Sequence, residues 1–339
     1  METLALIGLG SNLGDRKANL DRAITALSET PGVKFRTVSR YHETLPVGGP
    51  MGQGAFLNAA AAVDTTLAPE PLLDRLNAIE LEAGRVRSVR WGERTLDLDL
   101  LLFGDVVLET PRLQVPHPRL VVRRFVLAPL AEIAPDSIEP ATGMTVAALL
   151  ANLDRRPSYV ALSRHRGDER PIFRHLIAGL SAVGLSRGLE RGTGDLVSPD
   201  FAQGERLTPY LRLLEQTTAE LRRDRWSDAV WGDRWVVTDF WFDRIYRLAT
   251  CEIPKSGTSG SDFTPFRDRF LQLRPTVIEP TFLVLDRWVK IPEVRDYLHD
   301  EDSPSPGDVR SVPTLRPDTD DPDEIASEIL AACRATRAG

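Results

Sequence analysis

Cysteine and net positive charge are both scarce in this sequence. Only two cysteines, Cys251 and Cys333, occur among 339 residues, and neither belongs to a Cys-x-x-Cys pair. A structural zinc site and a disulfide framework are therefore not expected, and a reducing compartment is favoured. The formal net charge is −7 at pH 7, whereas general nucleic-acid binders usually present a basic face. A nucleic-acid partner is not expected either.

Long apolar runs are also missing. No stretch approaches the roughly 18 apolar residues that a membrane-spanning helix needs, and the segment from Met1 to Gly8 carries no basic leader of the kind found in signal peptides. We therefore expect a cytoplasmic protein with no membrane partner. The composition, with 42% hydrophobic and 27% charged residues, is typical of globular domains, and the length allows two of them.

The first half of the chain alternates between strand and helix patterns. Asp15 is a good N-cap for a helix in which Leu20, Ile24 and Leu27 recur at helical spacing. The predicted elements are a strand at 4–9, a helix after 15, strands at 33–41 and 56–63, a helix at 69–83, a strand at 95–103 and a helix at 124–134. This order is typical of an α+β sandwich with helices on one face of the sheet.

Two aspartates share one face of the strand predicted at 95–103. Residues two apart on a strand project to the same side, so Asp97 and Asp99 lie together while Leu98 faces the other way. Neighbouring like charges repel, and a cation between them removes the conflict. Mg²⁺ suits this place because it prefers carboxylate, phosphate and water oxygens. The alternative is a half-exposed strand with a solvated acidic face.

An arginine-rich loop directly precedes the aspartates. It contains two glycines, Gly84 and Gly92, and the arginines Arg85, Arg87, Arg90 and Arg94. Guanidinium groups bind phosphate oxygens in pairs, and glycines allow such a loop to close over a ligand. Metal-binding carboxylates beside a cationic cluster can neutralise a polyphosphate from two sides. The alternative, a solvated basic loop, does not explain why the arginines stand next to the aspartates.

The run from 84 to 103 resembles the signature of the 6-hydroxymethyl-7,8-dihydropterin pyrophosphokinase family, enzymes of folate biosynthesis. The resemblance covers roughly residues 1 to 155 and is specific because many motifs occur in order. It implies a ferredoxin-like α+β fold and transfer of pyrophosphate from ATP to the pterin alcohol, which releases AMP. The other matching pieces are Gly10-Ser11-Asn12-Leu13-Gly14, Thr44-Leu45-Pro46-Val47-Gly48, Phe56-Leu57-Asn58-Ala59, Ile79-Glu80, Val115-Pro116-His117-Pro118, Arg123, Phe125 and 130–135.

The resemblance also implies roles for individual residues. Asp97 and Asp99 would bind two Mg²⁺ ions that bridge the ATP phosphates, and Arg85 and Arg94 would join them as catalytic residues. The positions that contact ATP are Glu80, Arg85, Arg87, Arg90, Arg94, Arg112, His117 and Arg123. The positions that surround the pterin are Thr44, Pro46, Phe56, Asn58, Trp91 and Phe125, with the two phenylalanines on either side of the ring.

Taken singly, several of these residues are consistent with structural roles. Phe56 and Phe125 suit a hydrophobic core, Asn58 suits a strand edge, and His117 between two prolines suits a rigid corner. The chain departs from the family in small ways, for example in having Gln114 where threonine is common. The sequence nominates no general base.

A second domain is predicted after a polar linker. We expect a pterin pyrophosphokinase domain at 1–156, a linker at 157–171 and a P-loop kinase-like α/β domain at 172–339. In that domain the apolar segment 176–178 leads into Gly179 to Ser186, which has P-loop spacing but Leu185 in place of the lysine. A weaker resemblance to deoxynucleoside kinases covers 235–244, with Asp239 and Asp243, together with 282–286 and 312–332.

Three interpretations of the second half stay open. It is a degenerate kinase-like domain kept for structure or for interactions such as self-association, a nucleotide-binding but inactive module, or an active deoxynucleoside kinase. The last would make the protein bifunctional. For the whole chain, the rival to an enzyme is a non-catalytic protein that binds pterin or nucleotide. We favour an enzyme with one active site, in the first half.

Overall fold

The computed structural model describes residues 2–47, 49–50, 52–84, 92–155, 157–163, 170–185, 207–226, 234–243, 245–246, 249, 260–285 and 312–338. These residues belong to two compact units. The first contains 1–154, 288–315 and 328–339, and the second contains 155–287 and 316–327. Within the described ranges, no helix has the length and apolar character that crossing a membrane requires.

The first unit is built around an antiparallel sheet in the order β2-β4-β1-β5, with β3 paired to β4. The predicted α+β class and the order of strands and helices are confirmed. The strand predicted at 33–41 ends earlier, at Val38, and a short strand that was not predicted follows at His42–Thr44. The bounds are β1 Thr3–Ser11, β2 Val33–Val38, β3 His42–Thr44, β4 Phe56–Thr65 and β5 Asp97–Phe103.

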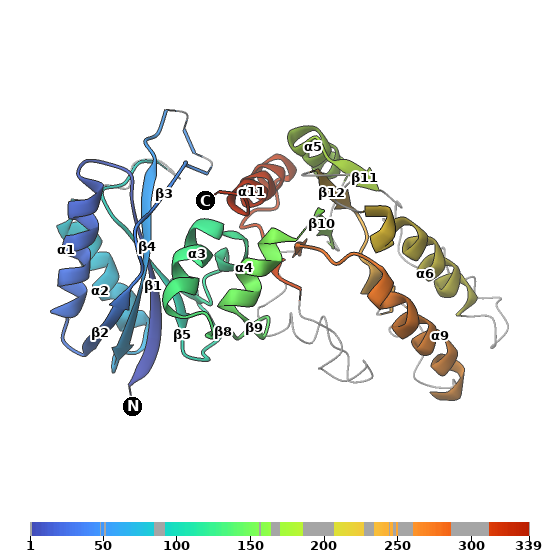
Figure 1. Cartoon of the computed structure of the whole chain (residues 1–339), viewed down its shortest axis with the longest axis horizontal. Helices are drawn as coiled ribbons and strands as arrows, with labels where there is room; N and C mark the ends of the chain where they lie inside the picture. The colour runs from blue at the N-terminus through green and yellow to red at the C-terminus, as the bar shows by residue number, and fades with distance from the viewer. Residues whose placement is uncertain are drawn as a thin grey trace. The chain divides into compact units, whose positions relative to one another are not determined.

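Helices cover both faces of this sheet. Helices α1 (Arg16–Ser28) and α2 (Pro69–Glu82) lie on one face, and α3 (Arg124–Ile133) lies on the other beside α4 (Val146–Asp154) (Figure 1). The prediction of helices on a single face was therefore wrong. Nearly every residue of β4 is buried, and a strand buried on both sides needs a cover on each.

Local signals explain how the helices of the first unit begin and end. The side chain of Asp15 accepts a hydrogen bond from the backbone N–H of Ala18 at 3.0 Å, which is the predicted N-cap. Helix α2 is followed by Gly84, whose φ of +76° favours glycine. The short elements of this unit are β6 Leu108–Glu109, β7 Gln114–Val115, the 3₁₀ turn Leu120–Val122, β8 Ile138–Glu139 and β9 Met144–Thr145.

The second unit contains a parallel sheet. Parallel pairs join four strands in the order β11-β12-β10-β13, as expected for an α/β domain. Their bounds are β10 Ser158–Leu162, β11 Val183–Leu185, β12 Trp235–Thr238 and β13 Phe282–Val284. The helices are α5 Arg170–Leu180, α6 Thr208–Leu221 and α9 Gly260–Leu273, with 3₁₀ turns at Arg223–Trp226 and Arg274–Thr276. Toward the end of the chain follow β14 Thr314–Leu315 and α11 Pro322–Ala335.

The structure corrects the predicted linker at 157–171, which contains β10, a fully buried strand in the interior of the sheet. The apolar segment 176–178 lies inside α5, in which Ile172 and Leu176 recur at helical spacing and are both buried. The glycines of the predicted P-loop therefore end a helix and enter β11, so they do not connect a strand to a following helix.

Candidate active site

Strand β5 presents two carboxylates on one face. Its burial alternates as predicted, since Asp97 and Asp99 are partly exposed while Leu98 and Leu100 are buried. The exposed fraction is 20% for the side chain of Asp97 and 34% for that of Asp99. Both line a pocket of the first unit. The strand pattern thus places two acids where a ligand can reach them.

The start of β5 is fixed to the end of β1. The hydroxyl of Ser11 donates to the carbonyl of Thr95 at 2.6 Å, and Asn12 accepts from the backbone N–H of Arg94 at 2.8 Å. The backbone N–H of Asn12 returns a bond to the carbonyl of Arg94 at 3.1 Å. These bonds give Ser11 and Asn12 of the motif Gly10-Ser11-Asn12-Leu13-Gly14 a structural role, because they hold the backbone from which Arg94 projects.

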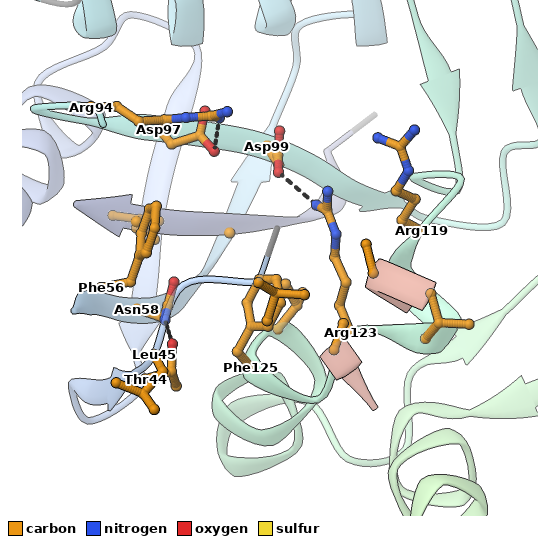
Figure 2. Close-up of a pocket in the computed structure, with 18 of the residues that line it drawn as sticks. Thr44, Leu45, Phe56, Asn58, Arg94, Asp97, Asp99, Arg119, Arg123 and Phe125 are labelled. Carbon is orange, nitrogen blue, oxygen red and sulfur yellow. Dashed lines mark hydrogen bonds and ion pairs between the residues drawn. The ribbon is translucent and has the colours of Figure 1, made fainter. Parts of the chain in front are cut away.

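Cationic side chains surround the two carboxylates. Arg94 lies 2.6 Å from Asp97, and Arg123 lies 3.4 Å from Asp99 (Figure 2). His117 approaches Asp99 with its Nε2 at 3.8 Å. Two acids flanked by two arginines and a histidine suit a ligand that brings both phosphate oxygens and a divalent metal.

The histidine is neutral in this setting. Burial lowers the pKa of His117 well below its usual range, and the charges of Arg123 and Arg119 act in the same direction. The Nδ1 of His117 accepts a hydrogen bond from the backbone N–H of Arg119 at 3.1 Å. The neutral ring therefore carries its proton on Nε2, on the side of Asp99. A neutral donor contributes a hydrogen bond without adding to the positive charge.

The other end of the pocket is aromatic. Phe56 from β4 and Phe125 from α3 project into the pocket from different elements (Figure 2). Asn58 is buried, and its amide nitrogen donates to the hydroxyl of Thr44 at 2.8 Å, so the orientation of the amide is fixed. Gly10 lies beneath them, and a Cβ added there would meet Asn58 at 3.4 Å and Phe56 at 3.9 Å. The arrangement suits a flat heterocycle with a polar edge.

Most of the described site residues that were predicted converge on this pocket. Thr44, Phe56, Asn58, Arg94, Asp97, Asp99, Arg123 and Phe125 line it. Glu80 is buried under β5, where its carboxylate accepts from the backbone N–H of Leu98 at 2.7 Å. Arg112 pairs with Asp74 at 2.5 Å. Neither Glu80, Arg112, His117 nor Pro46 is among the lining residues. Arg85, Arg87, Arg90 and Trp91 fall outside the described residues.

The pocket also contains residues that the sequence did not single out. Gln53, Val122 and Arg119 line it, and so does Glu328 near the end of the chain. Arg119 directly follows the Pro-His-Pro corner, and this position next to a predicted phosphate ligand was a signal that could have found it. No local pattern marks Glu328 as part of a site.

The arrangement divides the pocket into two chemical halves. One half is lined by paired charges and the other by aromatic and aliphatic side chains with a fixed amide. Among the described residues, no group of three or more His, Cys, Asp or Glu side chains is placed to hold a metal ion. Two carboxylates nonetheless suit Mg²⁺ that arrives with a polyphosphate, because phosphate and water oxygens complete its coordination.

Comparison with known proteins relates the first part of the chain to one family. Residues 6–135 match the model of the 7,8-dihydro-6-hydroxymethylpterin-pyrophosphokinase (HPPK) family. A 2-amino-4-hydroxy-6-hydroxymethyldihydropteridine pyrophosphokinase from Pseudomonas aeruginosa is 51% identical over 130 residues, which cover 38% of this chain and 80% of that protein. The protein of the same name from Bacillus subtilis is 49% identical over 142 residues, or 42% of this chain and 84% of the relative.

Among solved structures, an HPPK-DHPS in complex with substrates aligns with 98% of this chain and 83% of its own. The sequence identity is 10% and the TM-score 0.36, values too low to bear on the arrangement of either unit. The site residues predicted above all lie between positions 44 and 125, inside the segment matched by the family model.

Proposed function

Because the chain belongs to the 7,8-dihydro-6-hydroxymethylpterin-pyrophosphokinase family, we propose that the pocket of its first unit is the place of catalysis. The protein is a transferase that moves pyrophosphate from ATP to 6-hydroxymethyl-7,8-dihydropterin, a step of folate biosynthesis. One observation carries the placement. A single pocket joins the acid pair of β5 to two phenylalanines and a fixed amide.

The charged half of the pocket takes the triphosphate. Asp97 and Asp99 hold Mg²⁺ together with ATP, and Arg94 and Arg123 bind phosphate oxygens from the flanks. Two Mg²⁺ ions bound in this way would neutralise the negative charge on the phosphates. His117 donates from Nε2 toward the same region. The resemblance implies that Arg85, Arg87 and Arg90, which lie outside the described residues, also bind ATP.

The aromatic half takes the pterin. Phe56 and Phe125 stack on its two faces, and Asn58 reads its amide edge because Thr44 fixes the side-chain orientation. The hydroxymethyl oxygen then faces the triphosphate. It attacks the β-phosphorus in line, the bond from that phosphorus to the α-phosphate oxygen breaks, AMP leaves, and the alcohol proton passes to solvent. Rate enhancement comes from positioning and charge neutralisation.

The fold of the first unit supports this placement. The proposed ferredoxin-like sandwich is supported by the order β1, α1, β2, β4, α2, β5, with the short β3 inserted after β2, and by the antiparallel sheet β2-β4-β1-β5. β5 is an edge strand of that sheet, and it pairs with β1 through Gly10 and Asp97. Asp97 and Asp99 of β5 and Phe56 and Asn58 of β4 therefore come from strands that the sheet holds in a fixed register.

For the second unit we propose a degenerate kinase-like domain without its own phosphotransfer. Its parallel sheet agrees with a kinase-like α/β domain. The lysines of the chain, at positions 17, 34, 255 and 290, do not follow a glycine, so the sequence contains no Gly-Lys-Ser/Thr of a P-loop. Without that ammonium group, a nucleotide loses its main side-chain contact to the β- and γ-phosphates.

A product assay tests the function. The purified full-length protein is incubated with Mg-ATP, with and without 6-hydroxymethyl-7,8-dihydropterin, and the nucleotides are separated. We expect AMP that depends on the pterin and equals the pterin diphosphate in amount. ADP in place of AMP would indicate transfer of a single phosphate, and the absence of both would favour a non-catalytic binding protein.

A further inference from the structure

The last turns of the chain form part of the catalytic pocket. Helix α11 (Pro322–Ala335) contributes Glu328, Ala331, Ala332 and Ala335 to its lining. Residues 328–339 belong to the same compact unit as 1–154. The lining positions recur at intervals of three and four residues, so they lie on one face of the helix. Three of them are alanines, which leave room in the pocket.

Glu328 forms an ion pair with Arg119, a cationic residue of the pocket. The Nε of Arg119 donates to its Oε1 at 3.1 Å and the Nη2 to the same oxygen at 2.5 Å, although the two residues are 209 positions apart. The exposed fraction is 4% for the side chain of Glu328 and 20% for that of Arg119. An ion pair that is shielded from water in this way and joined by two hydrogen bonds fixes the plane of the guanidinium.

Arg119 lies beside the groups that receive the phosphates. The backbone N–H of Arg119 donates to Nδ1 of His117 at 3.1 Å, and Arg119 and Arg123 both line the pocket. In Figure 2 Arg119 stands next to Arg123, on the side of the pocket where Asp99 projects. A guanidinium in this position can bind an oxygen of a polyphosphate on the metal-binding side.

We propose that Arg119 is a further ATP-binding residue and that Glu328 is its positioning residue, so that the C-terminal helix completes the active site of the first unit. The proposal rests on the pyrophosphokinase function stated above. The guanidinium groups of Arg119 and Arg123 repel one another, and the carboxylate of Glu328 offsets this repulsion while it holds Arg119 at the edge of the pocket. Without it, Arg119 turns away from His117 and Arg123, and ATP loses a contact.

Steady-state kinetics on full-length variants test the proposal. Glu328→Gln keeps the shape of the side chain and removes its charge, and we expect the KM for ATP to rise on the order of tenfold with less than a twofold change in the KM for the pterin. Glu328→Asp should restore part of the ATP affinity. The matched control is Glu324→Gln, an exposed position on the same helix, which should leave both constants unchanged.

The pair must also behave as a unit. Arg119→Gln should raise the KM for ATP at least as much as Glu328→Gln, and the double variant should be no worse than Arg119→Gln alone, because the second change acts only through the first. A purely structural role would instead lower the melting temperature and the active fraction while leaving the KM for ATP unchanged in the folded enzyme, and this result would overturn the proposal.

Two further outcomes count against it. A lower KM for ATP in Glu328→Gln would mean that the carboxylate competes with the phosphates, and additive effects in the double variant would mean that the residues act separately. AMP formation by the wild-type protein distinguishes a failure of this proposal from a failure of the proposed function. If the wild type forms no AMP, the function itself fails, whereas normal AMP formation with an unaltered Glu328→Gln variant contradicts the positioning role alone.

Discussion

The two units use the same kinds of charged residue in different ways. In the first, Asp99 is 34% exposed and lies 3.4 Å from Arg123, beside a pocket. In the second, Asp243 and Arg274 are each 12% exposed, and the guanidinium donates to both carboxylate oxygens at 3.0 to 3.2 Å. The pair Asp99–Arg123 is longer and partly exposed, so a ligand can reach it, and we call it the open pair. The pair Asp243–Arg274 is nearly buried and fully hydrogen-bonded, and we call it the closed pair.

The network of the second unit extends this contrast. Glu279 lies 3.8 Å from Arg274 and pairs with Arg155 at 2.6 Å. Near the end of β12, Thr238 is buried and its hydroxyl lies 3.0 Å from that of Tyr159, which is also buried. Polar groups that satisfy one another inside a protein specify structure, whereas partly exposed charges around a pocket keep capacity for a ligand.

The largest effect is expected at the two carboxylates of β5 beside the pocket. Asp97→Asn and Asp99→Asn should each lower the rate of AMP formation by about 1000-fold, because the neutral amides bind Mg²⁺ poorly and leave the phosphate charge unbalanced. The rate is measured under saturating substrates together with the thermal stability. Asp136→Asn, an exposed aspartate of the same unit, is the control. Near-normal turnover in either site variant would contradict the assignment of these carboxylates.

A smaller effect is expected in the aromatic half. Phe125→Ala should raise the KM for the pterin by about tenfold through the loss of a stacking face, with little change in the KM for ATP. Phe125→Leu keeps apolar volume but not the flat face, so it separates stacking from simple burial. Equal KM values for Phe125→Leu and the wild type would show that stacking does not hold the pterin.

Patterns within one element predicted much of the first unit. Asp15 caps its helix as expected, because the cap depends on bonds between residues three positions apart. The alternation along β5 correctly placed Asp97 and Asp99 on one face, since the side-chain period of a strand is fixed by its backbone. These features need no knowledge of distant residues.

Contacts between distant segments could not be predicted in this way. Glu80, whose predicted contact with the nucleotide stays a prediction, accepts from the backbone N–H of Leu98, and only the packing of α2 under β5 reveals this bond. The pair between Arg119 and Glu328 joins positions 209 apart. The apolar run at 176–178 was compatible with a strand or a helix, and burial against the rest of the unit decided for the helix.

The closed pair of the second unit should affect stability rather than catalysis. Asp243→Asn leaves the guanidinium of Arg274 with a weaker partner and should lower the free energy of unfolding by about 3 kcal/mol. Tryptophan fluorescence follows this unit, because Trp226, Trp235 and Trp241 are buried in it. Asp268→Asn, at an exposed pair, should leave the midpoint of denaturation unchanged.

Kinetics on the same variant sharpen the comparison. At a temperature where the Asp243→Asn variant is folded, its KM values for ATP and for the pterin should equal those of the wild type. A large change in either constant would show that the charges of the second unit take part in catalysis, and the contrast between an open and a closed pair would then fail.

The smallest effect concerns charges of the first unit that lie outside the pocket. Glu132 on α3 contacts Arg40 at 2.8 Å and His42 at 2.9 Å. The hydrogen bond from Arg40 lowers the pKa of Glu132 to about 2, from an ordinary value of 4.5. A carboxyl group whose pKa is lowered in the folded state stabilises that state above its unfolded pKa. This contribution is therefore present above pH 4.5 and is lost as the pH falls toward 2.

Glu132→Gln should remove this part of the acid dependence. Its free energy of unfolding should fall less steeply than that of the wild type between pH 4.5 and 2, as measured by denaturant titration at several pH values, while the rate of AMP formation at pH 7 stays the same. Glu2→Gln, at an exposed position near the start of the chain, is the control. If Glu132→Gln instead slowed AMP formation without altering the pH profile of stability, charges outside the pocket would have to be counted with the site, because α3 also carries Phe125.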